Sequence, residues 1–193
     1  MNIILKCDDF WGKDWEREKL FFDVVLRRNI KISLGVVGAG ITTANKEAID
    51  FLKENKDLVE VFNHSFWHVV GKPVKEFYKT SDEYQKESIS RTDQIVLERL
   101  GVQIETIGFP ANACDQRALD FLKDYSLIKN IYYTPEAHNR KEIEQIGKRI
   151  INIDGESVIQ LHPFAHDFSL EEFEAMVIEK LAQGHAFIFP SEL

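Results

Sequence analysis

The chain has 193 residues, of which 44% are hydrophobic, and it carries 24 Lys and Arg against 32 Asp and Glu. This length and composition predict one globular domain, residues 1–193, that buries most of its apolar surface without disulfides or structural metal. The net charge of -8 and the lack of a Lys or Arg cluster argue against nucleic acid or an anionic membrane as a partner. No stretch reaches the roughly 20 apolar residues of a membrane-spanning helix, so we expect no membrane insertion.

The two cysteines, Cys7 and Cys114, lie far apart in the sequence and make no disulfide framework, so we expect two buried free thiols. The first apolar run is too short for a signal-peptide core, is interrupted by Lys6 and is followed by two aspartates, which favours a strand. These features favour a cytoplasmic protein. The oligomeric state is left open.

Strands and helices alternate along the first half of the chain. The apolar spacing predicts strand Asn2–Cys7, helix Lys13–Arg28, strand Ile30–Val37, a helix from Asn45 to Lys56, strand Leu58–Phe62, and a long helix ending at Gly101. Asn45 is a typical N-cap residue. Thr80 and Glu83 have the spacing of a capping box, which predicts where the long helix begins.

The alternation continues to the end of the sequence. The second half predicts strand Ile104–Gly108, helix Asp115–Lys123, an apolar run Leu127–Tyr133, strand Arg149–Ile153, strand Val158–Leu161, a helix capped by Ser169 and Glu172, and strand Ala186–Phe189. Strands that are apolar throughout and alternate with helices indicate a parallel α/β sheet covered by helices. With seven or eight strands, such a sheet either closes as a barrel or stays open and doubly wound.

The residues that follow the strands are the candidate site residues, because ligands of parallel sheets bind at the carboxyl ends of the strands. Asp8 and Asp9 follow the first strand, His64 to His68 follow the third, residues 108–112 follow the fourth, and His162 ends a late strand. These ends collect two carboxylates and three of the six histidines.

His64 and His68 are four residues apart, a spacing that places two imidazoles on one side of a helical turn. The pair alone is weak evidence for a metal, because two polar loop residues share this spacing in many proteins. An aspartate at the end of a neighbouring strand would complete a set of two His and one Asp, which leaves coordination positions open for water and substrate.

Adjacent aspartates inside a regular strand would point to opposite faces. At the end of the strand, where the chain turns, Asp8 and Asp9 are both able to face one site. The alternative is that one of them caps the following helix, a position for which Asp14 is better placed.

Four motifs resemble those of the polysaccharide deacetylases, carbohydrate esterase family four. The Thr-Phe-Asp-Asp-Gly motif corresponds to residues 6–10, and the His-Ser/Thr-x-x-His motif is matched without a change by residues 64–68. The Arg-x-Pro-x motif is similar to residues 108–111, and the Leu-His motif to Leu161-His162. The motifs follow the order of the family. The second is specific, whereas the other three are persuasive only together.

The resemblance implies a distorted, incomplete (β/α) barrel of seven to eight mostly parallel strands that holds one divalent metal, most often zinc, with cobalt or manganese as alternatives. It implies that Asp9, His64 and His68 bind the metal, that Asp8 is the general base and that His162 is the general acid. The reaction that the resemblance implies is hydrolysis of an N-acetyl group on an amino sugar or sugar conjugate. General acid and base groups beside a Lewis-acidic metal suit that chemistry.

The resemblance also implies that the backbone N–H of Ala111, after Pro110, helps to hold the oxyanion. Trp11, Phe66 and Trp67 are candidates for a sugar-stacking platform, although core packing is the commoner role of a single aromatic residue. Asn112 is a candidate for substrate contact or, with Asp115 three residues later, for a helix N-cap.

Three residues depart from the family pattern. Phe10 stands where the family has glycine, Ala111 where it has an aromatic residue, and Gly108 where it has the arginine that orients the catalytic aspartate. The absence of this arginine leaves two alternatives: either another side chain holds Asp8 in place, or the activity is reduced or lost.

The residues and the resemblance support three hypotheses about the function of the protein. The leading hypothesis is a metal-dependent N-deacetylase acting on a precursor of a surface glycan. The second is a deacetylase-like domain with impaired catalysis that binds metal or glycan. The third is a non-haem iron enzyme, because two His and one carboxylate also form its metal site.

Overall fold

The structure is a computed structural model that describes residues 1–71, 73–134 and 143–193. Its strands are β1 (Asn2–Phe10), β2 (Ile32–Val36), β3 (Val59–Asn63), β4 (Thr106–Gly108), β5 (Asn130–Tyr133), β6 (Arg149–Asn152), β7 (Val158–Leu161) and β8 (Ala186–Phe187). The helices are α1 (Trp15–Arg28), α2 (Gly38–Thr43), α3 (Lys46–Glu54), α4 (Asp82–Leu100), α5 (Gln116–Asp124) and α7 (Leu170–Ala182), with short 3-10 helices η1 (Pro110–Asn112) and η2 (Pro190–Glu192).

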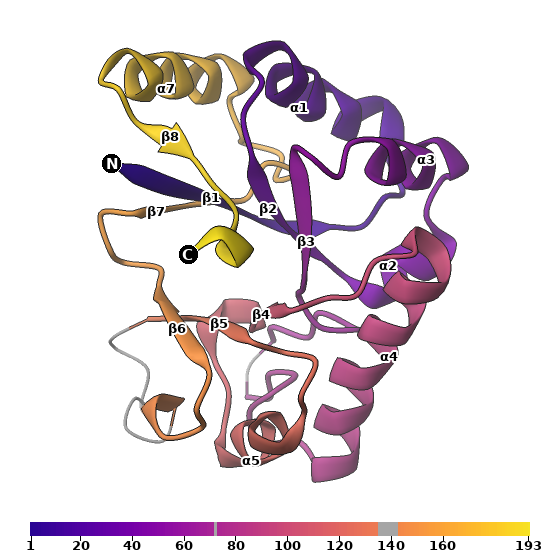
Figure 1. Cartoon of the computed structure of the whole chain (residues 1–193). Helices are drawn as coiled ribbons and strands as arrows, with labels where there is room; N and C mark the ends of the chain where they lie inside the picture. Colours follow the sequence, from indigo (N-terminus) through magenta and orange to yellow (C-terminus); the bar gives the residue numbers. More distant parts are fainter. Residues whose placement is uncertain (72, 135–142) are drawn as a thin grey trace.

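The strands form one parallel sheet in the order β6-β5-β4-β3-β2-β1-β7, and β8 pairs with the start of β1. The sheet curls, and the helices cover its outer side (Figure 1). In the described part of the chain β6 and β7 are the two ends of the strand order, so an unsealed seam lies between them. The fold is therefore the incomplete α/β barrel that the resemblance implies.

Most predicted elements and their caps are confirmed. Asn45 and Ser169 accept hydrogen bonds from the first turns of α3 and α7, and Gly101 ends α4 in the left-handed conformation with φ 64°. The predicted start of α4 is wrong by one residue. Ser81 caps this helix, because the Thr80 hydroxyl donates instead to the Glu76 carbonyl oxygen.

The structure adds a short helix, α2, that the apolar spacing does not predict. It also extends β1 to Phe10 and shortens the last strand to two residues. Asp14 precedes α1, but its side chain makes no capping hydrogen bond. Cys7 is a buried free thiol as expected, whereas Cys114 is only half-buried.

Alternation along β1 divides the buried side chains into two sets. Leu5 and Cys7 belong to a large apolar core that also takes in side chains of the helices, which we call the outer core. Ile4 belongs to a small cluster with side chains of β3, β5, β6 and β7 and of the residue that follows β6, namely Phe62, Tyr132, Ile151, Val158 and Ile153. We call the space around this second cluster the barrel interior. Lys6 and Asp8, two and four residues after Ile4, share its side of β1.

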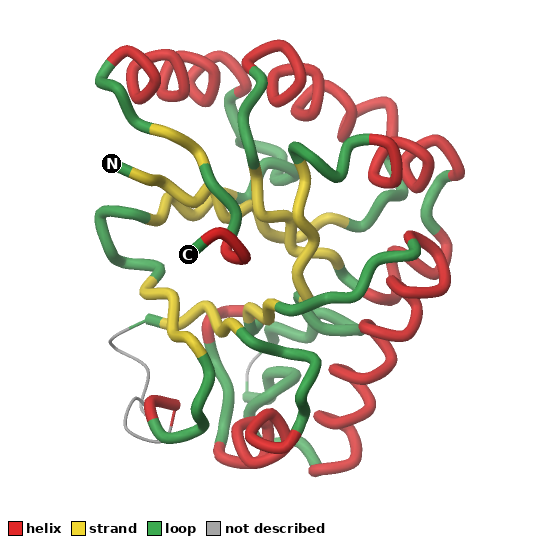
Figure 2. Tube along the Cα trace, viewed as in Figure 1, coloured by secondary structure: helices red, strands yellow, loops and turns green. Residues whose placement is uncertain are grey.

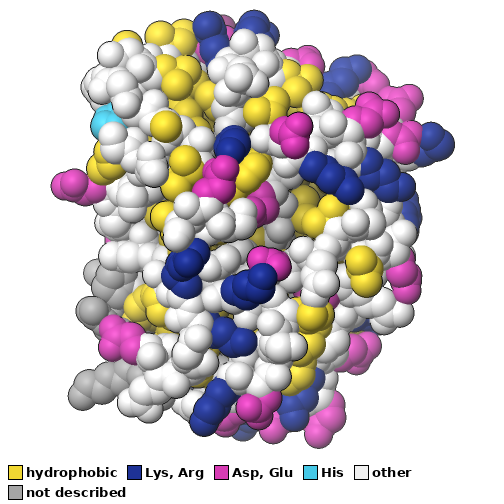
Figure 3. Space-filling model, in the orientation of Figure 1, with side chains coloured by type: hydrophobic (Ala, Val, Ile, Leu, Met, Phe, Trp, Pro, Cys, Tyr) yellow, Lys and Arg dark blue, Asp and Glu magenta, His cyan; other side chains and the backbone are white. Residues whose placement is uncertain are grey.

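One end of the barrel is covered by the C-terminal helix η2, which lies within the ring of strands in Figure 2. Lys31 pairs with Glu192, and the Ser191 hydroxyl donates to Glu60, so the start of β2 and β3 are both tied to η2. The surface seen from this side mixes basic and acidic side chains (Figure 3). The carboxyl ends of the strands lie at the opposite end. Within the described residues no helix is both long and apolar enough to cross a membrane.

Candidate functional site

The end of β1 presents both aspartates to one place. Asp8 is buried on the interior side, and Asp9 has a φ of 68°, a left-handed conformation that is uncommon for a non-glycine residue. The register between β1 and β2 shifts between Cys7 and Phe10. This irregularity breaks the alternation of the strand, so that neighbouring side chains no longer point to opposite faces.

The segment after β3 brings His64 and His68 together without forming a helix. Ser65 and His68 have positive φ values of 76° and 57°, which turn the chain sharply. The imidazole rings come to rest with centroids 5.2 Å apart. The expectation of a helical turn is therefore wrong, although the expected convergence of the two rings is found. Local hydrogen bonds hold the turn, since the Ser65 hydroxyl accepts from the His68 N–H at 3.1 Å.

Asp9, His64 and His68 form the one candidate metal cluster among the residues that the structure describes, with one atom from each lying within 4.8 Å of the others. Oδ1 of Asp9 is 2.7 Å from Nε2 of His68 and 3.1 Å from Nε2 of His64. Nδ1 of His64 lies 2.7 Å from the Gly108 carbonyl oxygen, so the proton of the ring is assigned to Nδ1, which donates a hydrogen bond to that oxygen. When the neutral imidazole of His64 carries its proton on Nδ1, the lone pair is on Nε2, the nitrogen that faces Asp9.

These three groups fit a divalent cation. The buried Oδ1 of Asp9 accepts no hydrogen bond of good geometry, and the His64 lone pair is directed toward it. Two imidazole nitrogens and one carboxylate oxygen are a ligand set for zinc or a similar metal. The Gly108 carbonyl fixes the tautomer of His64, as the outer partners of metal-binding histidines commonly do.

The pKa shifts of Asp9 and His68 both favour the charged form of each side chain. Burial alone would raise the pKa of Asp9, but the neighbouring His64 and His68 lower it to well below its usual range. Burial would lower the pKa of His68, but contact with Asp9 and the nearby charges of Glu76 and Asp8 give a net raised pKa.

Asp8 lies between three polar side chains. The Lys6 ammonium is 2.6 Å from Oδ1 and 2.5 Å from Oδ2, and the Gln160 amide donates to Oδ2 at 2.7 Å. Nε2 of His162, the residue after β7, is 3.8 Å from the same oxygen. The predicted base and acid are therefore neighbours. Lys6 and Gln160 are contacts that the sequence does not predict, since a lysine in an apolar run carries no sign of its partner.

A buried glutamate holds the loop that carries His68. Oε1 of Glu76 accepts the N–H of Phe66 and of Trp67, both at 3.1 Å, and Oε2 accepts the N–H of Val69 at 2.9 Å. The Ser88 hydroxyl of α4 donates to Oε1 at 2.5 Å. Glu76 was not predicted, because it is one charged residue in a polar stretch with no periodic pattern.

The segment after β4 contains the predicted oxyanion residue. Ala111 and Asn112 both have left-handed backbones, with φ values of 52° and 48°, and Ala111 is exposed. Pro110 is buried and begins η1. Asn112 is not a helix cap, because Asp115 caps α5 by accepting the N–H of Arg117.

The aromatic candidates lie in different surroundings. Trp11 is half-buried, with its ring 6.2 Å from that of His68 and edge-on to it. Trp67 stacks on Tyr84 of α4 at 4.5 Å, and Phe66 is buried. Trp11 is therefore the aromatic candidate placed beside the candidate metal cluster, whereas Trp67 packs against α4.

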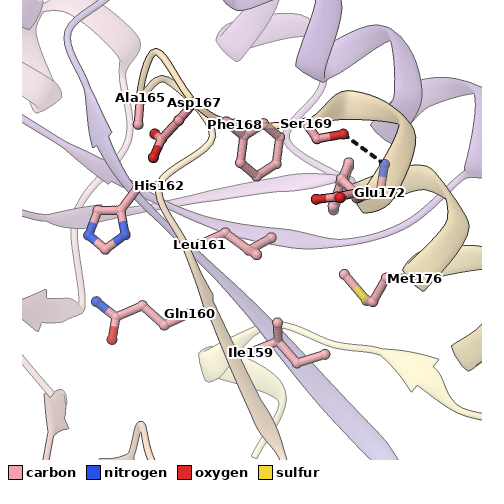
Figure 4. A pocket seen from close by; sticks show the side chains of 11 residues that line it. Ile159, Gln160, Leu161, His162, Ala165, Asp167, Phe168, Ser169, Glu172 and Met176 are labelled. Carbon is pink, nitrogen blue, oxygen red and sulfur yellow. Dashed lines mark hydrogen bonds between the residues drawn. The ribbon is translucent and has the colours of Figure 1, made fainter.

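Two cavities adjoin the site. One of about 410 Å³ lies between β7 and α7 beside His162. Figure 4 shows Gln160 and His162 pointing to one side of β7 and Leu161 pointing to the other, toward Met176 of α7. A second cavity of about 350 Å³ is lined by Asp9, Trp11 and residues of the loop after His162. Ala165, in the loop after His162, lines both cavities.

No family model and no curated protein matches this sequence. Solved structures do match its fold. The Xyl-CE4 domain of a multidomain xylanase from the hindgut metagenome of Trinervitermes trinervoides has 14% identity and a TM-score of 0.72, over 99% of this chain and 88% of that one. A family 4 acetyl xylan esterase from Clostridium thermocellum, in complex with a cobalt ion, has 15% identity and a TM-score of 0.70, over 100% of this chain and 89% of that one.

A third match is a family pseudoenzyme. This wild-type CE4 protein from Bacillus anthracis has 17% identity and a TM-score of 0.67, over 99% of this chain and 64% of that one. At these identities the matches establish the fold, and the resemblance read from the motifs is confirmed at that level. The chemistry of the site rests on its own residues.

Proposed function

We propose that the protein is a metal-dependent hydrolase that removes an N-acetyl or related acyl group from an amino sugar or sugar conjugate. One observation carries the proposal. A buried carboxylate, Asp8, and an imidazole, His162, lie together beside a separate cluster of two histidines and one aspartate. The fold shared with carbohydrate esterases supports the same class of reaction.

In this proposal Asp9, His64 and His68 hold the cation, with zinc favoured by the two nitrogen ligands and cobalt or manganese as alternatives. A divalent cation held there supplies Lewis-acid polarisation of the acyl carbonyl and activation of a water molecule. Asp8 takes the proton of the attacking water, and His162 gives a proton to the departing amine. The backbone N–H of Ala111 helps to stabilise the oxyanion.

The second candidate is a domain that binds metal or glycan without turnover. Gly108, in place of the family arginine, favours it, and one protein with this fold is described as a pseudoenzyme. The tethers on Asp8 favour the active enzyme, because its carboxylate is held by Lys6 and Gln160. A non-haem iron enzyme is less favoured, because it has no need of Asp8 and His162 next to the metal ligands.

The test is acetate release from a panel of N-acetyl sugars and sugar nucleotides, with zinc, cobalt or manganese added. We expect Asp8→Asn and His162→Ala to keep the metal and to lose turnover by roughly 100- to 10,000-fold. The control Glu98→Gln changes an exposed side chain of α4 and keeps the activity. Stoichiometric metal without acetate release on any substrate supports the binding domain, and iron-dependent oxygen consumption supports the oxygenase.

The biosynthetic setting is part of the proposal. We propose that the enzyme acts in the cytoplasm on a precursor of a surface glycan. A higher kcat/KM on soluble sugar conjugates than on a finished polymer supports this setting, and the reverse order contradicts it.

A further inference from the structure

Lys6 is a charged side chain in the barrel interior. It is fully buried, and its ammonium group lies 5.3 Å from the centroids of both the Phe62 and the Tyr132 ring. Removing a lysine from water is costly unless the charge is paired. Its ionic partner is Asp8, and it contacts both carboxylate oxygens.

Gly108 on β4 makes room for this lysine. A Cβ atom at position 108 would lie 2.8 Å from Cε2 of Phe62 and 3.4 Å from Cε of Lys6. The stem of Lys6 and the ring of Phe62 therefore occupy the space into which a side chain at position 108 would extend. With Lys6 and Phe62 in place, a large residue at position 108 does not fit, and the cation that reaches Asp8 comes from β1.

We propose that Lys6 is the positioning residue of the proposed reaction, fixing the Asp8 carboxylate in the orientation from which it acts as base. The inference rests on the proposed function. Lys6 bridges Oδ1 and Oδ2, and Gln160 binds Oδ2 from β7, so rotation of the carboxylate would break contacts on two sides. Lys6 also supplies the positive charge that pairs with the buried carboxylate of Asp8. Lys6 acts through Asp8 and needs no contact with substrate.

A cycle of four proteins tests this role: wild type, Lys6→Met, Asp8→Asn and the double variant. Methionine keeps most of the length of lysine and removes its charge. We expect Lys6→Met to lower kcat at least 10-fold with KM and metal stoichiometry unchanged. In the Asp8→Asn background the same change should lower kcat less than 2-fold, because the group that Lys6 positions is gone. Lys6→Arg, which keeps the charge, should be more active than Lys6→Met.

Thermal unfolding of the same four proteins provides a readout that does not depend on activity. Lys6→Met should lower the melting temperature when Asp8 is present, because it leaves a buried carboxylate without its cation, and should lower it far less when residue 8 is asparagine. The double variant removes both charges, so it gives a folded reference if Lys6→Met alone unfolds. Lys129→Met, which breaks an exposed pair with Glu105, is the matched control and should change neither kcat nor the coupling.

The outcomes separate the two proposals. A kcat within 2-fold of wild type in Lys6→Met, or equal losses in both backgrounds, overturns the positioning role. If the wild type releases no acetate from any substrate, the proposed function fails. The melting temperatures then still decide whether Lys6 and Asp8 are coupled, and the absence of coupling overturns the pairing itself.

Discussion

The outer core and the barrel interior share the same strands, yet they are built from different kinds of side chain. On β1, Leu5 and Cys7 face the outer core with apolar atoms, whereas Lys6 and Asp8 place an ion pair on the interior side. The outer core is large and reaches every major helix, and the interior cluster is small. The large apolar core and the ion pair next to the candidate site therefore lie on opposite faces of one sheet.

The outer core gains its stability from close-packed rings and branched chains. Around α1 and α7, Phe21 lies 5.0 Å from Phe173 and 5.5 Å from Phe22, at ring distances typical of favourable aromatic pairs. The apolar packing of this core does not depend on a charge reaching one particular oxygen atom. The arrangement in the barrel interior does, because Lys6 and Gln160 must both lie within hydrogen-bonding distance of the Asp8 carboxylate.

The largest effect is expected at the metal cluster. His68→Ala and Asp9→Asn should each weaken divalent-cation binding by more than about 100-fold, because a site with three ligands loses one of them. The fold should persist, since the outer core is untouched. Calorimetric titration with zinc measures the affinity, and His185→Ala, on the loop between α7 and β8, is the control. If either variant binds zinc stoichiometrically and with wild-type affinity, the substituted residue is not a metal ligand.

The second prediction concerns a substitution in the outer core that leaves the residues of the candidate site unchanged. Leu122 of α5 is fully buried, so Leu122→Ala should lower the free energy of unfolding by about 2–5 kcal/mol. Below the melting temperature, kcat and zinc affinity should stay near those of wild type. Leu97→Ala, at an exposed position of α4, should change the free energy of unfolding by less than about 0.5 kcal/mol. A large loss of kcat in Leu122→Ala at low temperature would show that the two faces are not independent.

The third prediction concerns Asp93 of α4, a charged residue among the apolar contacts of the outer layer. Its carboxylate accepts a hydrogen bond from the Asn63 amide at 2.8 Å, and burial raises its pKa from 3.8 to about 6. Tyr125 also contacts Asp93, and its pKa is raised by burial and by that carboxylate. Between about pH 4 and pH 6 the folded protein keeps a proton that the unfolded chain releases. Stability therefore falls as the pH rises through this window.

The shift corresponds to at most about 3 kcal/mol of stability, lost in full above about pH 6. Asp93→Asn has no proton to lose, so its advantage over wild type should grow from pH 4 to pH 6.5 and then stay constant. Urea denaturation of both proteins across this range gives the difference curve, in which the titrations of other groups cancel. A flat difference curve contradicts the raised pKa.

The sequence predicts most of the outer core, because most helices and strands show the apolar spacing of their secondary structure, the short helix α2 being an exception. The capping residues Asn45, Ser169 and Gly101 mark their helix ends through local hydrogen bonds or backbone conformation, which need no distant partner. The candidate site is predictable for a related reason. Parallel strands bring their carboxyl ends together, so Asp8, Asp9, His64, His68 and His162 could be grouped from strand order and spacing.

The surroundings of Asp8 and the role of Gly108 could not be predicted, because they depend on contacts between segments that are distant in the sequence. Gln160 meets Asp8 only when β7 lies beside β1, and Gly108 matters only because Phe62 and Lys6 fill the space next to it. The positive φ of Asp9 is equally hidden, since aspartate does not signal that conformation as glycine does.

A weaker effect is expected at Glu76, at the rim of the barrel, which belongs neither to the outer core nor to the cluster of the barrel interior. Its carboxylate accepts three backbone N–H groups of the loop that carries His68, and glutamine has only one oxygen to replace two. Glu76→Gln should therefore leave at least one N–H without its acceptor and loosen the position of His68. We expect zinc affinity to fall by about 10- to 100-fold, as for other groups that support a metal ligand.

Glu98→Gln is the matched control, since it makes the same chemical change at an exposed position of α4 and should leave zinc affinity as it is. Thermal unfolding of metal-free Glu76→Gln then separates two causes of a weaker site. If the loop alone is loosened, zinc affinity falls while the melting temperature drops only slightly, because the outer core carries the stability. A large drop in melting temperature would place Glu76 among the residues that hold the fold, and the rim would then belong with the outer core.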